Sequence, residues 1–394
     1  MTLAGTAGIA RANGAPGGRA DAPYRLMVVD DSAVIRGLLT RSLEADPEVS
    51  VLVSASNGEM ALAALKRYDI EIVILDIEMP VMDGLTALPK LLAAKPSLKV
   101  IIASTLTRRG ADISMKALAA GAADYVTKPV ASVLTGADEF KRELLAKVKA
   151  LGQARRRAAG TAAPHRTSPR FTAADAPTTT GTETAADPGR RVVVLRQPGG
   201  ERPEAVAIGS STGGPQALFR VLGALEGSVK QPIFITQHMP ATFTTILAEH
   251  IARGSGYPTA EGVDGEPVKE GRIYVAPGDF HMTIEGAGRD KVVRLSKGPP
   301  ENFCRPSVDP MLRSLVAVYG ARLLTIMLTG MGHDGLNGAR AVVDAGGTLI
   351  AQDEATSVVW GMPGSVATAG LCSAVLPVDE IGSYIAKFAQ RARR

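Results

Sequence analysis

The chain has 394 residues, so two or three domains are expected, and its hydrophobic content of 45% is normal for globular cores. No apolar run approaches the ~20 residues that a membrane helix needs, which argues against membrane insertion. The two cysteines, Cys304 and Cys372, offer neither a disulfide framework nor a metal-ligand spacing. A cytoplasmic protein with buried thiols is therefore predicted.

The formal net charge of +5 does not indicate nucleic-acid binding. Residues 141–170 hold nine Lys and Arg against one acid, Glu143, so this stretch carries +8 and the rest of the chain carries −3. A folded DNA-reading domain needs a basic face of its own. Here the basic excess falls in a terminal helix and a linker, where it is typical of a solvated stretch.

The first part of the chain reads as a short tail followed by a domain. Residues 1–23 lack the basic and apolar regions of a signal peptide and are predicted to form a disordered tail. Residues 24–148 then alternate between strand candidates (RLMVV, VSVLV, IVIL, VIIA and DYVT) and amphipathic helices. This alternation predicts a doubly wound, five-stranded parallel sheet with helices on both faces.

Charged and polar side chains follow the strands of this domain where each strand ends. Asp30 and Asp31 follow the first strand, and Asp76 ends the third. In the strand order 2-1-3-4-5 the first and third strands are neighbours, so these carboxylates converge and a divalent cation would relieve their crowding. Ser104 and Lys128 end the fourth and fifth strands at the same edge. The set predicts phosphoryl transfer to Asp76, with Mg²⁺ bridging the oxygens and Ser104 and Lys128 binding the phosphoryl group.

The motifs VVDDS, LDIEMPVMDG and TKP strongly resemble the response-regulator receiver family. The resemblance covers residues 24–148 and implies that Asp76 is the phosphoacceptor. It also implies that Asp30, Asp31 and Asp76 hold Mg²⁺ together with the backbone carbonyl of Glu78, and that a chemotaxis histidine kinase is the phosphodonor.

A change of composition separates this domain from a second one. Residues 149–202 are basic at first and then rich in Ala, Thr and Pro, which predicts a linker. Residues 203–390 resume the alternation of strands and helices. This indicates a second α/β domain, expected as three layers, α/β/α, around a mostly parallel sheet.

The segment AVAIGSSTGGP, residues 205–215, carries the most information in the second domain. An apolar strand ends at a glycine, and hydroxyls then lead into a helix. Such a turn places a serine nucleophile beside free N–H groups that can bind an oxyanion. The same geometry also serves a phosphate-binding loop. The pattern alone does not choose between Ser210 and Ser211.

A serine nucleophile needs a base and a carboxylate that orients it. His238 ends the strand PIFITQ at the same sheet edge, and His281 also follows a strand and remains a rival. His250 falls on a helix face, where a structural role is the usual one. His333 and Asp334 lie in a glycine-rich turn after LLTIMLT, and Asp334 is the natural orienting carboxylate. Triads are defined by geometry, so the chain order Ser, His, Asp is no objection.

Five ordered motifs, IGSSTGGP, QHMP, YVAPGDFHM, LTGMGHDG and AQDEATSVVWGMP, are similar to those of the chemotaxis protein-glutamate methylesterase family. The resemblance covers residues 203–390. It implies that Ser211 is the nucleophile, His238 the base and Asp334 its orienter. It further implies an oxyanion hole from the backbone N–H groups of Thr212 and Met331, and no metal or other cofactor in this domain.

The family reaction is hydrolysis of glutamate γ-methyl esters on methyl-accepting chemotaxis receptors, with deamidation of glutamines as a second activity. By resemblance, the unphosphorylated receiver covers the esterase cleft and phosphorylation of Asp76 opens it. We expect a cytoplasmic monomer that binds no nucleic acid.

Two other functions compete with this one. The second domain of a response regulator can bind DNA or a partner without catalysis, but no helix-turn-helix pattern follows the linker. A nucleotide-binding module can use GSSTGG as a phosphate cradle, but the chain lacks both the Walker lysine and G-x-G-x-x-G spacing there.

Overall fold

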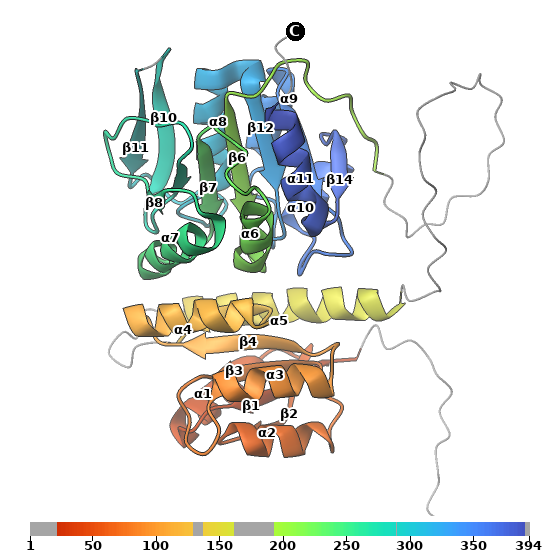
Figure 1. The fold of residues 1–394 in the computed structure, drawn as a ribbon. Helices are drawn as coiled ribbons and strands as arrows, with labels where there is room; N and C mark the ends of the chain where they lie inside the picture. Colours follow the sequence, from red (N-terminus) through yellow and green to blue (C-terminus); the bar gives the residue numbers. More distant parts are fainter. Residues whose placement is uncertain (1–21, 129–136, 161–192, 289, 391–394) are drawn as a thin grey trace, which may run out of the picture.

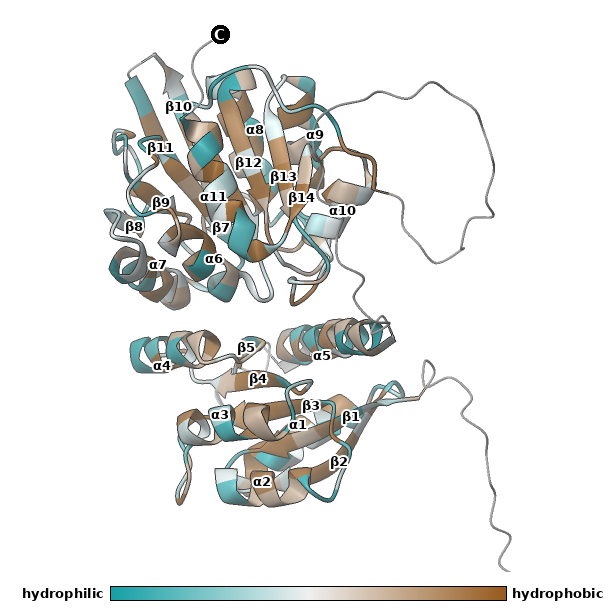
Figure 2. Ribbon diagram, turned by 45° about the vertical axis from the view of Figure 1, so that its right-hand side comes forward, coloured by the Kyte–Doolittle hydropathy of each residue, from teal (hydrophilic) through white to brown (hydrophobic). Residues whose placement is uncertain are grey.

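The structure is a computed structural model that describes residues 22–128, 137–160, 193–288 and 290–390. It contains two α/β domains, with helices α4 and α5 of the first lying between the two sheets (Figure 1). In both domains the strands are the most hydrophobic elements and helices cover them (Figure 2). Among the described helices, none has the length and apolar character required to cross a bilayer.

The first sheet has five parallel strands in the order β2-β1-β3-β4-β5, as predicted. Its strands are Tyr24–Val29 (β1), Val49–Ala55 (β2), Ile72–Asp76 (β3), Lys99–Ser104 (β4) and Asp124–Thr127 (β5). Every residue of the central β3 is buried, because helices cover both faces of the sheet.

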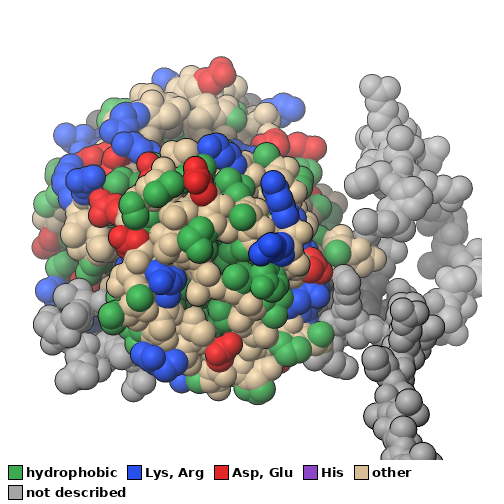
Figure 3. Space-filling view, turned by 90° about the horizontal axis from the view of Figure 1, so that it is seen from below, with side chains coloured by type: hydrophobic (Ala, Val, Ile, Leu, Met, Phe, Trp, Pro, Cys, Tyr) green, Lys and Arg blue, Asp and Glu red, His purple; other side chains and the backbone are tan. Residues whose placement is uncertain are grey.

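Five helices surround this sheet. They are Ala33–Glu44 (α1), Gly58–Leu65 (α2), Gly84–Ala94 (α3), Arg108–Ala119 (α4) and Ala137–Gly160 (α5). Polar side chains that accept a backbone hydrogen bond begin four of them, namely Ser32, Asn57, Asp83 and Thr107. Seen from below, the outer face of this domain carries acidic and basic side chains interspersed among apolar ones (Figure 3).

The second sheet has seven parallel strands in the order β14-β13-β12-β6-β7-β9-β8. Its strands are Ala205–Ser210 (β6), Ile233–Gln237 (β7), Thr259–Glu261 (β8), Ile273–Val275 (β9), Leu323–Met327 (β12), Thr348–Gln352 (β13) and Ala374–Leu376 (β14). The chain passes outward from β6 through β7 to the edge strand β8, places β9 between β7 and β8, and then returns to β12 on the other side of β6. The carboxyl ends of β6 and β12 therefore flank a topological switch point, where open α/β sheets place their sites.

Helices lie on both faces of this sheet, which confirms the three-layer expectation. They are Gly214–Gly223 (α6), Ala241–Ser255 (α7), Val308–Tyr319 (α8), Leu336–Asp344 (α9), Met362–Thr368 (α10) and Val378–Ala389 (α11), with a 3₁₀ turn at Gly320–Arg322. The strands His281–Ala287 (β10) and Asp290–Ser296 (β11) pair antiparallel in a separate two-stranded sheet.

Both ends of the expected linker, residues 149–202, lie within the described residues. Helix α5 continues to Gly160 rather than stopping near residue 148, because Arg155 and Arg156 form ion pairs with the buried Glu71 at the start of β3. Residues 193–202 form no helix or strand but pack on the second domain, where the N–H of Arg196 donates to the carbonyl of Cys372. The expected disordered tail and most of the expected linker lie outside the described residues.

Candidate functional site

Three turns meet at the carboxyl edge of the second sheet. They follow β6, β7 and β12 and contain Ser211, His238 and Asp334, respectively. The register pairs Gly209 of β6 with Met327 of β12, and Ser210 with Gln237 of β7, so these strands end level with one another. The sheet therefore brings the predicted residues to one place.

The two adjacent serines have different surroundings. Ser210 is fully buried, and its hydroxyl donates to Gln237 Oε1 at 2.7 Å. Ser211 is half-buried, and no hydrogen bond involves its hydroxyl in the part of the chain that the structure describes. Gln237 also binds the backbone carbonyl of Ser211 through Nε2 at 2.9 Å, which fixes the turn. Ser211 is thus the serine whose oxygen remains available.

A tight approach of backbone to side chain explains the glycines after this serine. Gly213 has φ = 77°, which favours glycine, and a Cβ on it would lie 2.5 Å from Val358. A Cβ on Gly214 would lie 1.9 Å from Gln237 Oε1. Together the two glycines allow α6 to begin directly behind the serine.

His238 and Asp334 form a close pair. His238 Nε2 lies 2.8 Å from Asp334 Oδ2, and the Asp334 side chain is 3% exposed. Burial on its own would lower the pKa of His238, but the hydrogen bond to the Asp334 carboxylate raises it above the ordinary value. Burial opposes ionisation of Asp334 as well, yet His238 and neighbouring donors hold its pKa below the usual range.

Those neighbouring donors come from the first turn of α8 and the loop before it. Asp334 accepts hydrogen bonds from Val308 N at 2.6 Å, Ser307 Oγ at 2.7 Å and Asn302 Nδ2 at 2.8 Å. A helix N-terminus favours a carboxylate, since its free N–H groups carry partial positive charge. Asp334 is therefore held as an anion in a fixed orientation. Ser307 and Asn302 were not predicted from the sequence, because nothing in their local pattern links them to a turn about thirty residues later.

The two backbone amides predicted to form an oxyanion hole belong to two different turns at this edge. Thr212 follows Ser211 directly, and Met331 lies in the turn after β12. Within the described residues, no hydrogen bond joins the N–H of Thr212 or of Met331 to another group. Both amides are thus free to donate.

The other histidines make different contacts. His281 is buried, its Nε2 donates to the carbonyl of Pro299 at 3.0 Å, and its Nδ1 accepts from Ser307 N at 3.3 Å, so both its ring nitrogens have partners other than Asp334. His250 on α7 pairs with Asp112 of α4, with 3.0 Å between Nε2 and Oδ1. His333 is exposed. Within the described residues, His238 is the one candidate histidine whose ring contacts Asp334.

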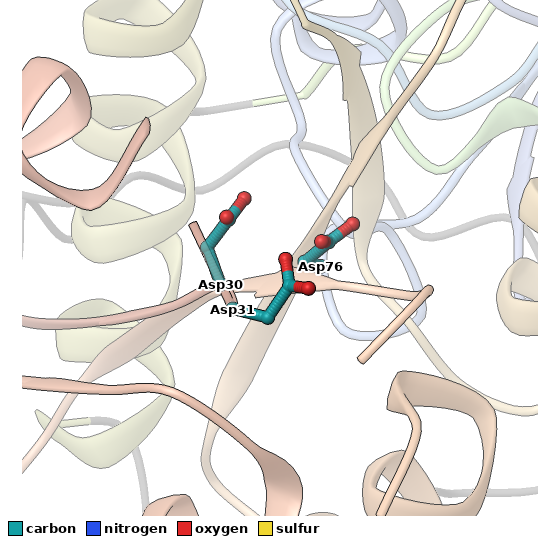
Figure 4. Close-up of side chains that lie close together, drawn as sticks. All are labelled: Asp30, Asp31 and Asp76. Carbon is teal, nitrogen blue, oxygen red and sulfur yellow. The ribbon is translucent and has the colours of Figure 1, made fainter. Parts of the chain in front are cut away.

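The first domain carries the predicted acidic cluster (Figure 4). Carboxylate oxygens of Asp30, Asp31 and Asp76 all lie within 4.8 Å of one another. Lys128 Nζ bridges two of them, at 2.7 Å from Asp30 Oδ2 and 2.8 Å from Asp76 Oδ1. Burial raises the pKa of Asp76, whereas burial of Lys128 is outweighed by its two carboxylate partners, which raise its pKa.

This cluster fits a hard divalent cation. It offers three carboxylates at one edge, and one of them, Asp31, is exposed and so reachable from solvent. Ser104 lies at the end of β4 and donates to the carbonyl of Gly110 at 3.0 Å. The exposed side chain of Glu78 lies 3.3 Å from Arg109 Nε, so it makes an ion pair apart from the cluster. A role for the Glu78 carbonyl as a ligand stays a prediction.

The two domains meet through α4 and β5 of the first and α6 and α7 of the second. Arg108 NH2 lies 2.5 Å from Glu249 Oε1, and Gln216 Nε2 donates to the carbonyl of Ala122 at 2.5 Å. The rings of Tyr125 and Phe243 stack, with 4.4 Å between centroids. Polar and aromatic contacts therefore join the domains in this arrangement.

Helix α5 lies near the carboxyl edge of the second sheet, which is the edge that carries the candidate site (Figure 1). Val359 belongs to the buried apolar cluster that contains Phe140 and Leu144 of α5, and Met331 and Val358 pack against this cluster. Met331 carries one of the free amides. The first domain thus covers part of the candidate site. Neither Phe243 nor Val359 stood out in the sequence, since apolar residues at an interface look like core residues.

Comparison with known proteins gives matches to both domains. Residues 206–385 match the CheB methylesterase family, and residues 26–134 match the response regulator receiver domain. The chain is 58% identical over 377 residues to "Protein-glutamate methylesterase/protein-glutamine glutaminase 1" of Paramagnetospirillum magneticum, covering 93% of this chain and 96% of the relative. It is 59% identical over 386 residues to the protein of that activity from Azospirillum brasilense, covering 96% of this chain and 95% of the relative.

Two solved structures from Thermotoga maritima match one domain each. The CheB methylesterase catalytic domain is 40% identical, with a TM-score of 0.46, and covers 47% of this chain and 98% of its own. The response regulator domain of CheB is 35% identical, with a TM-score of 0.30, and covers 32% of this chain and 94% of its own. Because this similarity to its relatives extends over nearly the full length of the chain, the chain belongs to the family of protein-glutamate methylesterase/protein-glutamine glutaminase hydrolases that carry a receiver domain.

Proposed function

We propose that this chain hydrolyses glutamate γ-methyl esters on the cytoplasmic regions of methyl-accepting chemotaxis receptors, with Ser211 as nucleophile and with phosphorylation of Asp76 as the activating signal. One observation carries the assignment. The half-buried Ser211, whose hydroxyl is unengaged among the described residues, shares a sheet edge with the His238–Asp334 pair. A nucleophile, a base and an orienting acid are the parts that acyl transfer needs.

The first half of the reaction forms an acyl-enzyme. His238 accepts the Ser211 proton on Nδ1, because Nε2 already bonds to Asp334. Ser211 Oγ attacks the γ-carbonyl carbon, and the resulting oxyanion accepts hydrogen bonds from the amides of Thr212 and Met331. The C–O bond to the methoxy group then breaks, and the proton on His238 passes to the leaving oxygen, so methanol departs.

The second half returns the enzyme to its starting state. His238 takes a proton from water as the water oxygen attacks the acyl carbon. The bond to Ser211 Oγ breaks, Ser211 recovers its proton from His238, and a free glutamate side chain is released. With a glutamine side chain as substrate, ammonia leaves in the first half in place of methanol, which is the deamidase reaction.

Control of the reaction depends on the first domain. We assign Asp76 as the phosphoacceptor, with a histidine kinase as donor, and Lys128 and Ser104 as the groups that bind the phosphoryl oxygens. Mg²⁺ held by Asp30, Asp31 and Asp76 supplies positive charge to those oxygens when bound. The covering of Met331 and Val359 by α5 supports an inhibited resting state that a shift of the domain interface relieves.

The assignment of the nucleophile is tested by methanol release from methylated receptor membranes. Ser211→Ala is expected to abolish release. Ser210→Ala is the matched control, since it removes the neighbouring hydroxyl, which is buried against Gln237, and it should retain measurable release. Circular dichroism of both variants checks their folding. Release at the wild-type rate by Ser211→Ala would refute the assignment.

A further inference from the structure

Both ring nitrogens of His238 are engaged in this structure. Nε2 lies 2.8 Å from Asp334 Oδ2, and Nδ1 lies 3.4 Å from Cys304 Sγ. Neither contact involves Ser211, although the mechanism above needs Nδ1 to accept the Ser211 proton. The Cys304 thiol therefore occupies the hydrogen-bonding position at Nδ1 that the Ser211 hydroxyl requires.

The direction of these hydrogen bonds follows from Asp334. Its carboxylate already accepts from Val308 N, Ser307 Oγ and Asn302 Nδ2, so it is ionised and can only accept. Nε2 of His238 must then carry a proton, and in the neutral imidazole, the form that acts as the base, Nδ1 holds the lone pair. The Cys304 thiol is the donor to it. The lone pair is therefore unavailable to Ser211 while this contact lasts.

The position of Cys304 does not depend on its contact with His238. Its backbone forms a pair of hydrogen bonds with Glu301, 2.9 Å and 3.1 Å long, that closes a tight turn. Side chains at the start of the turn also hold it, because Asn302 bonds to Asp334 and Glu301 Oε1 lies 2.6 Å from Arg313 NH2. A side chain shortened at position 304 should therefore leave the turn in place.

We propose that Cys304 is a positioning residue that holds Nδ1 of His238 in the resting enzyme, and that the Ser211 hydroxyl must displace this thiol before it can be deprotonated. The inference rests on the proposed function. A thiol is a weak donor compared with a hydroxyl. The contact is accordingly strong enough to orient the imidazole and weak enough to be exchanged when substrate places Ser211 for attack.

The test uses the full chain and a fluorophosphonate, a probe that reacts with activated serines, with the label mapped by mass spectrometry. Cys304→Ala frees Nδ1 and is expected to speed labelling of Ser211 about two- to tenfold, the range of one neutral hydrogen bond. Cys304→Ser keeps a donor at this position, and a stronger one than the thiol, so it is expected to label no faster than the wild type. Cys372→Ala, at the other cysteine, is the matched control and should label as the wild type does.

A second measurement reads the contact from the sulfur side. Alkylation of Cys304 by iodoacetamide should be faster than that of the buried Cys372, and His238→Ala should slow it, because the imidazole no longer accepts the thiol proton. Faster Ser211 labelling in Cys304→Ala together with slower Cys304 alkylation in His238→Ala supports the proposal. Unchanged labelling in Cys304→Ala, or unchanged alkylation in His238→Ala, overturns it. Absence of any label on Ser211 in both the wild type and Cys304→Ala, with acetyl phosphate and Mg²⁺ present, instead overturns the proposed function.

Discussion

Tyr125 of the receiver domain stacks on Phe243 of the esterase domain, with ring centroids 4.4 Å apart and ring planes 9° from parallel. Tyr125 lies on β5, a strand of four residues. Lys128, which bridges Asp30 and Asp76, follows the end of that strand directly. Lys128 therefore connects the acidic cluster to one end of this short strand, and Tyr125 within the strand contacts the other domain.

Loss of this stacked pair should loosen the interface. Tyr125→Ala is expected to raise methanol release in the absence of a phosphodonor about two- to tenfold, because an aromatic pair contributes about 0.5–1.5 kcal/mol beyond its buried area. Initial rates of methanol release from methylated receptor membranes measure the effect.

Arg108→Ala is the matched control for the same interface. The Arg108–Glu249 pair is exposed, with side chains 69% and 41% accessible, so its removal should change the basal rate by less than about threefold and less still in high salt. Equal basal rates in Tyr125→Ala and the wild type would show that the stacked pair does not restrain the esterase.

Asp334→Asn should change the pH dependence of the esterase as well as its rate. The Asp334 carboxylate raises the pKa of His238, and the base works only when it is deprotonated. Wild-type activity therefore rises as the pH increases through that raised pKa. Without the carboxylate the pKa of His238 falls, so the acidic limb of kcat/KM should move to lower pH while kcat drops by about 10²- to 10⁴-fold. An acidic limb that keeps its position would contradict the role of Asp334.

Removal of divalent metal should affect control but not basal catalysis. The acidic cluster of Asp30, Asp31 and Asp76 belongs to the receiver, and the esterase mechanism uses only side chains and amides. Chelation by EDTA is expected to abolish activation by acetyl phosphate and to leave the unstimulated rate of methanol release unchanged. Loss of the unstimulated rate on chelation would place a metal in the esterase reaction.

The ion pairs of Glu71 should stabilise the receiver in a pH-dependent way. Glu71 is buried, which would raise its pKa, but hydrogen bonds from Arg156 and from the amide of Arg25 lower it below the usual value. A lowered folded pKa contributes stability above the unfolded pKa of about 4.3, and this is lost as the pH falls through the folded value. Glu71→Gln should therefore lower the free energy of unfolding of the receiver by about 1–3 kcal/mol at neutral pH, and the difference should close below about pH 4.

Hydrogen exchange measures this effect within the intact chain. Amides of β3, beside Glu71, should exchange faster in Glu71→Gln, while those of β12 in the esterase domain serve as an internal reference. Equal protection of β3 in the two proteins at neutral pH would contradict the prediction.

The ends of parallel strands were the most predictable features. Asp30, Asp76 and Lys128 follow apolar runs in the sequence, and strand order alone brings such positions to one edge. His238 and Asp334 were located in the same way. Family resemblance added the choice of Ser211, which strand patterns could not make. In the structure the two serines differ because the Ser210 hydroxyl donates a hydrogen bond to Gln237, twenty-seven residues later.

Features that depend on side-chain contacts between distant elements were not predicted. The contact of Cys304 with His238 joins residues 66 positions apart, and no local pattern marks it. Helix α5 extends to Gly160, beyond the end expected from the sequence, because the buried Glu71 pairs with Arg155 and Arg156. In the sequence these arginines look like part of a solvated stretch. Tertiary contacts override composition in both cases.

The central claim is that phosphorylation of Asp76 controls the reactivity of Ser211. The most direct measurement is the rate at which a fluorophosphonate labels Ser211 in the full chain, with and without acetyl phosphate and Mg²⁺, in the wild type and in Asp76→Asn. Faster labelling on addition of the phosphodonor in the wild type, and no change in Asp76→Asn, is the predicted result. Labelling of Ser211 at the same rate with and without the phosphodonor in the wild type would contradict the claim.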